Sequence, residues 1–208
     1  MKRLAIIGAS GHGRVLADIA KITGYTDIVF LDDNPDKSEC AGYPIIGPSY
    51  MASDLDAFLI VGIGNTVIRR RIQESLPNEK LITLIHPDAV IAEDVIIGEG
   101  SVVMAGVVLN TGTKVGKGCI INTSSSVDHD CEIGDYVHIA VGSHVCGGVQ
   151  VDCGSWVGAG AVISNNLYIC PDCIIGAGTV LIDSIYESGT YVGVPARKIN
   201  RGVKPNET

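Results

Sequence analysis

One histidine carries the clearest chemical signal in the sequence. His129 is flanked by two carboxylates, Asp128 and Asp130. Histidine has an ordinary pKa near neutrality, so it can act as a general base at physiological pH. A carboxylate on one ring nitrogen would fix the tautomer and raise the basicity of the other nitrogen, as in a catalytic triad. The alternative interpretation is a surface histidine without a catalytic role.

A six-residue repeat must position this triplet. Every sixth residue from Ile85 to Leu181 is Ile, Leu or Val, without one insertion. The residue four places after each of these is also restricted, as at Ser101 and Val107, so both positions should point inward. Two inward positions in six residues predict a short strand and a turn, and three such sides close one coil. The repeat therefore predicts a parallel β-helix of between five and six coils over residues 85–186.

The repeat also assigns several other residues. His129 falls two places after the inward Val127, on the outward part of its hexapeptide. Cys119, Cys131 and Cys173 fall on the small inward position, where a thiol packs as a small apolar group. Glycine often follows the aliphatic residue, which suits a corner that needs unusual backbone angles or close approach.

The residues before 85 follow a different pattern. Apolar runs at 4–7, 28–31 and 58–61 alternate with helix-like stretches at 13–22 and 66–76. This alternation predicts a small parallel sheet with both faces covered. We therefore expect a Rossmann-like α/β domain at 1–84, an all-β parallel β-helix domain at 85–186, and a C-terminal segment at 187–208.

A glycine-rich loop follows the first predicted strand, and an acidic pair follows the second. Gly8, Gly11 and Gly13 follow a strand and open a helix, where free amides can hold a phosphate or diphosphate. The spacing is not G-x-G-x-x-G, and a tight strand-to-helix turn explains it almost as well. Asp32 and Asp33 end the next strand, where a carboxylate can meet a ribose or a base. Their alternative is a turn, since Asp-Asp-Asn-Pro is good turn chemistry.

Composition excludes several classes of partner. The net charge is -8, and the one dense basic cluster is Arg69 to Arg71, so nucleic acid is not an expected partner. The longest apolar runs fall far short of the ~20 residues of a membrane span. No targeting segment is recognised, so we expect a cytoplasmic protein with its seven cysteines reduced.

Several ordered motifs make the sequence resemble the left-handed β-helix acyltransferases that carry a small nucleotide-binding N-terminal domain. The subgroups it resembles most are the bacterial UDP-4-amino-sugar N-acetyltransferases of the bacillosamine pathway and the O-acetyltransferases of sialic acid synthesis. The resemblance runs over nearly the whole chain and implies a left-handed coil and a homotrimer. Its motifs are Gly8-Ala-Ser-Gly-His-Gly13, Phe30-Leu-Asp-Asp33, Ile63-Gly-Asn65, Leu84-Ile-His-Pro87, Asn122-Thr-Ser-Ser125, Asp128-His-Asp130 and Tyr191-Val-Gly-Val-Pro-Ala196.

The resemblance also implies roles for single residues. His129 matches the catalytic base and Asp130 the acidic residue that tunes it, with Asp128 a candidate for the same task. Asn122 would position the acceptor, unless it is a structural asparagine of the coil. The UDP-sugar would be held by Ser10, Gly11, His12, Asp32, Asp33 and Gly64. Acetyl-CoA would be held by His138, Gly147, Gly158, Ala159, Gly176, Ala177 and Arg197, and no metal is implied.

The resulting hypothesis is direct acetyl transfer from acetyl-CoA to the 4-amino group of a UDP-4-amino-dideoxysugar. O-acetylation of a sugar, such as a sialic acid, would use the same base on a hydroxyl. A non-catalytic trimer that binds a nucleotide sugar is the alternative outside enzymology. A dinucleotide-dependent oxidoreductase is disfavoured, because the segment before residue 85 is too short for both halves of a doubly wound fold.

Overall fold

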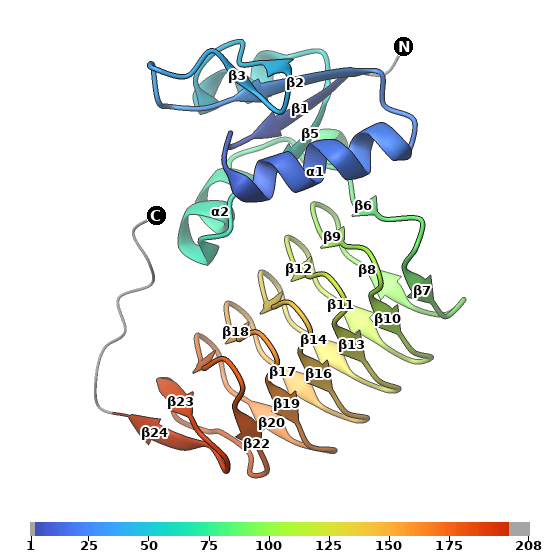
Figure 1. Cartoon of the computed structure of the whole chain (residues 1–208), viewed down its shortest axis with the longest axis vertical. Helices are drawn as coiled ribbons and strands as arrows, with labels where there is room; N and C mark the ends of the chain where they lie inside the picture. Colours follow the sequence, from blue (N-terminus) through green and yellow to red (C-terminus); the bar gives the residue numbers. More distant parts are fainter. Residues whose placement is uncertain (1–2, 200–208) are drawn as a thin grey trace.

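The computed structural model describes residues 3–199 and has two parts (Figure 1). A small α/β part contains the first strands and helices, and it lies against one side of a long triangular coil. The fold class predicted from the sequence is confirmed.

A three-stranded parallel sheet forms the α/β part. Its strands are β1 (Arg3–Ile7), β2 (Asp27–Leu31) and β5 (Phe58–Val61), in the order β2-β1-β5. Because side chains alternate along a strand, β1 serves two cores. Leu4 and Ile6 pack with helix α1 (Gly11–Ile22), whereas Ala5 and Ile7 pack on the other face with residues around η1 (Ser49–Asp54). The remaining elements of this part are β3 (Glu39–Cys40), β4 (Tyr43–Pro44), α2 (Thr66–Gln73) and η2 (Asn78–Lys80).

Two helix boundaries differ from the sequence prediction. Helix α1 begins at Gly11 rather than at residue 13, because Gly8 has a φ of 108° and turns the chain sharply after β1. Helix α2 ends at Gln73 rather than at residue 76, and Leu76 is buried under the sheet beyond the helix end. Asn65 caps α2, since its side-chain oxygen accepts a hydrogen bond from the amide of Ile68 at 3.1 Å.

The coil consists of two-residue parallel strands that stack into three sheets. The first sheet contains β6 (Leu84–Ile85), β9 (Val102–Val103), β12 (Ile120–Ile121), β15 (His138–Ile139), β18 (Trp156–Val157) and β21 (Ile174–Ile175). The second contains β7 (Val90–Ile91), β10 (Val108–Leu109), β13 (Ser126–Val127), β16 (His144–Val145), β19 (Val162–Ile163) and β22 (Val180–Leu181). The third contains β8 (Ile96–Ile97), β11 (Lys114–Val115), β14 (Glu132–Ile133), β17 (Gln150–Val151) and β20 (Tyr168–Ile169).

The interior of the coil is built from the two predicted inward positions. The second residue of nearly every strand is buried, and so is the residue four places later, including Ser101, Val107, Cys119, Cys131 and Cys173. Each coil adds one layer on top of the last with a register of eighteen residues, as between Val127 and Val145. The thiols therefore act as small packing groups, as the sequence predicted.

The glycines of the corners serve two separate purposes. Gly98 and Gly116 let successive coils approach each other closely. A Cβ added at either position would lie 2.6 Å or less from backbone or side-chain atoms of the next coil. The left-handed conformation occurs two residues later, as at Gly100 and Gly118. At Asp130, with a φ of 56°, a non-glycine residue occupies the same turn position.

The α/β part is held against the first sheet of the coil. The outward residues Leu84, Val102 and Ile120 share one core with Leu16 and Ile19 of α1. The next outward residues of this sheet lie beyond that core, and they are His138 and Trp156. Helix α1, with the glycine loop at its start, is therefore held against the first sheet of the coil.

The C-terminal part closes the far end of the coil. Strand β23 (Thr190–Val192) joins the first sheet beside β21, and β24 (Arg197–Ile199) pairs with it in antiparallel fashion. The predicted C-terminal segment runs on to residue 208, and residues 200–208 lie outside the described residues. None of the helices within residues 3–199 combines the length and the apolar character needed to cross a bilayer.

Candidate active site

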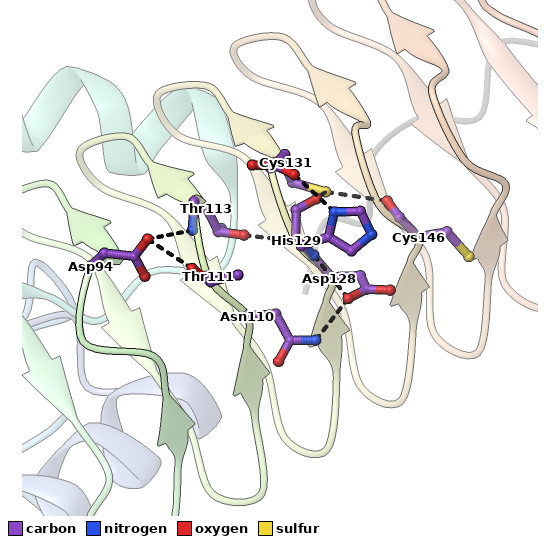
Figure 2. Close-up of polar contacts among 10 residues, drawn as sticks. Asp94, Asn110, Thr111, Thr113, Asp128, His129, Cys131 and Cys146 are labelled. Carbon is purple, nitrogen blue, oxygen red and sulfur yellow. Dashed lines mark hydrogen bonds and ion pairs between the residues drawn. The ribbon is translucent and has the colours of Figure 1, made fainter.

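His129 projects from a corner of the coil, in the turn between β13 and β14 (Figure 2). The inward Val127 and Cys131 on either side are fully buried and fix the backbone of the turn. The hydroxyl of Thr113, one coil earlier, donates a hydrogen bond to the carbonyl of Asp128 at 2.8 Å. The imidazole itself stands outward, with 54% of its side-chain surface exposed. The outward position predicted from the repeat is confirmed.

The two flanking carboxylates have different tasks. Asp130 accepts from the ring, with 2.9 Å between its Oδ2 and Nδ1 of His129. Asp128 instead accepts the backbone amide of His129 at 2.8 Å, and the side-chain amide of Asn110 donates to the same oxygen at 2.7 Å. Asp130 is therefore the carboxylate that orients the imidazole, and Asp128 with Asn110 holds its backbone. The hydrogen bond to Asp130, together with the charge of Asp128, raises the pKa of His129 above its usual value.

The other ring nitrogen faces Gly147, one coil further on. A Cβ added at Gly147 would lie 2.5 Å from Nε2 of His129, so only glycine leaves room for the ring. The carbonyl of His129 accepts a hydrogen bond from the amide of Gly148 at 2.9 Å, which fixes the spacing of the two coils. With Nδ1 bound to Asp130, Nε2 is the nitrogen left to take a proton from a substrate.

A second polar cluster lies on the first sheet, away from the corner that carries His129. Nε2 of His138 lies 3.1 Å from the side-chain nitrogen of Asn122, and its ring stacks on Trp156 with 6.0 Å between centroids. Burial, and after it the positive charge of Arg69, lowers the pKa of His138 to about 3. His138 is thus a neutral, fixed hydrogen-bonding group and not a freely solvated surface histidine.

The glycine loop forms a tight turn at the start of α1. A Cβ at Gly13 would lie 2.1 Å from the carbonyl oxygen of Gly8, so helix and strand approach at backbone distance. Ser10 precedes the helix, and its side chain makes no capping hydrogen bond. Burial, followed by the charge of Arg69, lowers the pKa of His12 to about 4. Nε2 of His12 is buried and has no hydrogen-bond partner among the described residues.

One member of the acidic pair, Asp32, helps to build this loop. Oδ2 of Asp32 accepts the amide of Ala9 at 2.7 Å, which ties the end of β2 to the glycine loop. Oδ1 of Asp32 accepts the amide of Asn34 at 3.0 Å, so the turn interpretation of the motif is correct for this residue. Asp33 accepts from both the amide and the hydroxyl of Ser49, at 2.7 and 2.9 Å, and is exposed.

Two basic residues beside this loop were not singled out from the sequence. Arg14 and Lys37 face an open pocket of about 370 Å³ next to the start of α1. The ammonium of Lys37 donates to the carbonyl of Ala9 at 3.0 Å. Two cations and a helix start suit a phosphate group. The pocket is lined by Ala9, Ser10, Gly11, Arg14, Lys37, Glu39, Cys40 and Ala41.

Apart from His138, the residues predicted to hold acetyl-CoA lie in three places. Gly147 shares the corner of His129. Gly158, Ala159, Gly176 and Ala177 follow β18 and β21, at the corner that also carries Asn122. Arg197 lies in β24, where its guanidinium donates to the carbonyl of Ala196 at 2.7 Å.

Gly64, predicted to hold the UDP-sugar, lies in the loop after β5, and its carbonyl accepts a hydrogen bond from the buried Arg69 at 2.9 Å.

Comparison with known proteins agrees with this architecture. Residues 3–76 match the family described as the PglD N-terminal domain. The chain is 35% identical over 110 residues to a UDP-N-acetylbacillosamine N-acetyltransferase of Bacillus subtilis, a match that covers 49% of this chain and 51% of the relative. The chain thus spans about half the length of that curated relative.

Two further matches cover more of the chain. A GDP-perosamine N-acetyltransferase of Escherichia coli O157:H7 is 33% identical over 150 residues, which is 67% of this chain and 68% of the relative. The acetyltransferase domain of PglB from Neisseria gonorrhoeae, solved in complex with acetyl coenzyme A, superimposes with a TM-score of 0.90 at 38% identity. That match covers 95% of this chain and 99% of the solved one. The chain therefore belongs to the family of left-handed β-helix sugar N-acetyltransferases with a PglD-type N-terminal domain.

Proposed function

We propose that the protein transfers the acetyl group of acetyl-CoA to the 4-amino group of a nucleotide-linked amino-dideoxysugar, with UDP as the expected nucleotide. The observation that carries the proposal is the His129–Asp130 pair, which leaves Nε2 as the free proton acceptor. The relatives named above are N-acetyltransferases for a UDP-linked and a GDP-linked sugar, which supports an amine as the acceptor.

The reaction needs one proton acceptor and two bound substrates. The amine nitrogen attacks the thioester carbonyl carbon, a C–N bond forms, and the C–S bond breaks with CoA as the leaving thiolate. Nε2 of His129 takes the proton that the amine must lose, and Asp130 stabilises the imidazolium that results. The same proton can then go to the thiolate of CoA. No covalent intermediate on the protein is required.

A substrate screen tests this function directly. Purified protein with acetyl-CoA is offered UDP- and GDP-linked 4-amino sugars, together with the corresponding 4-hydroxy sugars, and thiol release is followed. We expect release with at least one amine and with none of the alcohols. Release with the alcohols alone would identify a sugar O-acetyltransferase. Nucleotide binding without thiol release on any acceptor would favour a non-catalytic binding protein.

The acidic pair provides a test of the division between the two ligand sites. We predict that Asp32→Ala combined with Asp33→Ala raises the KM for the nucleotide sugar and leaves the KM for acetyl-CoA nearly unchanged. The reason is that Asp32 shapes the glycine loop through the amide of Ala9. This loop belongs to the α/β part, whereas His129 belongs to the coil. Steady-state kinetics with each substrate varied in turn measure both constants. Equal weakening of both substrates would contradict the assignment.

We also predict a trimer in solution. His129 stands at a corner between the second and third sheets, whereas the α/β part covers the first sheet. A nucleotide sugar held by the α/β part could reach a histidine at that corner if a neighbouring chain supplies it. Val90 and Ile96, which are 66% and 62% exposed, would be covered by such a neighbour. Light scattering at micromolar concentration checks the mass, and a monomer would contradict the prediction.

A further inference from the structure

Helix α2 buries the residues that a surface helix would usually expose. Val67 and Ile68 are 74% and 38% exposed, whereas Arg69 and Gln73 are each 1% exposed. These two polar residues are one helical turn apart and so face the same side. Apolar burial therefore does not explain how this side of α2 is held against the coil, and the polar contacts of Arg69 and Gln73 must do it.

The guanidinium of Arg69 reaches four backbone carbonyls in three segments of the chain. Nη1 donates to the carbonyls of Ile63 and Gly64 at 3.2 and 2.9 Å, in the loop after β5. Nε donates to the carbonyl of Gly118 at 2.8 Å, and Nη2 donates to that of Tyr136 at 2.8 Å. The planar, forked group is suited to several acceptors in fixed directions.

The two acceptors on the coil belong to successive layers. Gly118 and Tyr136 both have positive φ angles, of 62° and 59°, and each precedes a strand of the first sheet by two residues. The strand after Tyr136 is β15, which begins with His138. Gln73 adds a third layer, since its side-chain amide donates to the carbonyl of Glu99 at 3.1 Å. Arg69 thus connects the Gly64 loop to the turn that leads into His138.

The charge of Arg69 is compensated by carbonyl dipoles. Among residues 3–199 no carboxylate lies within ion-pair distance of it. The ionisable groups that interact with it are Cys119, Tyr136, His12 and His138. Burial raises the pKa of Cys119 and of Tyr136 to about 12, and burial together with the charge of Arg69 lowers the pKa of His12 to about 4 and that of His138 to about 3, so all four are neutral at physiological pH. Burial lowers the pKa of Arg69 to about 10, which leaves it charged. Burying a cation carries a desolvation cost that an apolar side chain would not have, so a gain in stability alone does not explain an arginine at this position.

We propose that Arg69 is a positioning residue, which holds the Ile63–Gly64 loop of the acceptor site in fixed register with the coil turn before His138. The inference rests on the proposed function for its catalytic consequence. A shift of the loop by about 1 Å would misplace the acceptor, and such misplacement can cost on the order of a hundredfold in rate. Acetyl-CoA, assigned to His138 and the coil corners, would bind as before, because the turn before His138 is also held by the coil itself. The amide of Tyr136 donates to the carbonyl of Lys117 at 2.8 Å, and the amide of His138 donates to that of Ser155 at 3.0 Å.

Arg69→Lys is the primary test. Lysine keeps the charge but offers one compact ammonium, which cannot span the four carbonyls. We expect the acceptor KM to rise by about tenfold or more and the KM for acetyl-CoA to stay within about twofold, in line with a loosened loop. The matched control is Arg71→Met, at an exposed position two residues away, which should change neither constant. A second variant, Arg69→Gln, can donate to at most two carbonyls and should shift the acceptor KM in the same direction.

Other outcomes would overturn the proposal. If Arg69→Lys and Arg69→Gln lower kcat in proportion to the folded fraction and leave both KM values unchanged, the residue is merely structural. If neither variant folds, the residue is required for the fold itself, and the positioning role is overturned as well. If Gln73→Leu raises the acceptor KM as much as Arg69→Lys does, docking of α2 in general is responsible and not the hold on the loop.

Calorimetry separates this test from the proposed function. UDP, GDP and CoA are titrated into wild type and Arg69→Lys, with no chemistry involved. We expect the nucleoside diphosphate that binds wild type to bind the variant at least about fivefold more weakly, with CoA unchanged, because the substitution disturbs only one of the two binding sites. Failure of acetyl transfer in wild type would end the proposed function, whereas unchanged nucleotide affinity in the variant would end the role of Arg69.

Discussion

Replacement of His129 by alanine is expected to lower kcat by on the order of 10²–10⁴, the range for loss of a positioned general base. The fold should survive, because the imidazole is outward and the buried Val127 and Cys131 remain in place. Acetyl-CoA should still bind, since its proposed contacts include His138 and corner amides elsewhere. The measurements are kcat on the best acceptor, CoA affinity, melting temperature and mass in solution.

The pH dependence gives an independent check on His129. The base must be neutral to accept a proton, so kcat/KM should fall as the pH drops through the pKa of His129. The hydrogen bond to Asp130 raises that pKa, so the fall should begin at a higher pH than for an ordinary histidine. Asp130→Asn should move the inflection to lower pH. An acceptor amine of different pKa shows whether the inflection belongs to the substrate instead.

Two outcomes would remove His129 from the mechanism. One is an alanine variant with near wild-type turnover. The other is a variant that loses activity only because the oligomer dissociates. Asp128, Asp130 and His138 would then be tested in its place.

Gly147→Ala should lower kcat by roughly ten- to a hundredfold, because it displaces the imidazole of His129 and a misplaced catalytic group loses about this much rate. The added Cβ would lie 2.5 Å from Nε2, so the imidazole must rotate away and lose its alignment with Asp130. Gly134→Ala is the matched control, because its Cβ would meet the backbone of Cys153 at 2.8 Å, at a corner without His129. That variant should lose more melting temperature than Gly147→Ala, because its Cβ meets backbone and not the end of a side chain that can move, and it should keep a near-normal kcat.

A double-mutant cycle decides whether the two residues act together. If Gly147→Ala acts by displacing the imidazole, it should cause no further loss in a chain that already carries His129→Ala. Strictly additive losses would show that Gly147 affects the reaction by another route, such as the binding of acetyl-CoA. Comparison of the KM for acetyl-CoA across the four proteins distinguishes these cases.

Local sequence patterns were sufficient for the strands of the coil and for the three strands of the parallel sheet and the two α-helices of the α/β part. The hexapeptide repeat predicted the coil because each layer repeats the same two inward positions, so burial can be read from the chain one residue at a time. The outward place of His129 followed from Val127 in the same way. Strands β1, β2 and β5 were predicted close to their observed bounds, since apolar runs between turn residues identify buried strands.

Contacts between distant segments could be read only from the tertiary structure. The family resemblance matched Asp130 to the carboxylate that tunes His129 and kept Asp128 as a candidate. The structure shows the ring bonded to Asp130, which occupies a left-handed turn with a φ of 56°. The sequence also indicated no partner for Asn122, because His138 meets it from the next layer.

The basic cluster of α2 illustrates the limit most clearly. By sequence, Arg69, Arg70 and Arg71 are equivalent surface cations on a short polar helix. In the fold, Arg70 pairs with Glu74 on the surface, Arg71 is exposed, and Arg69 is buried against four carbonyls. Backbone carbonyls carry no side-chain identity, so nothing in the chain marks them as partners of one arginine. The sequence by itself determined the coil, the sheet and the position of His129, whereas the folded backbone alone decided which polar groups meet across the layers.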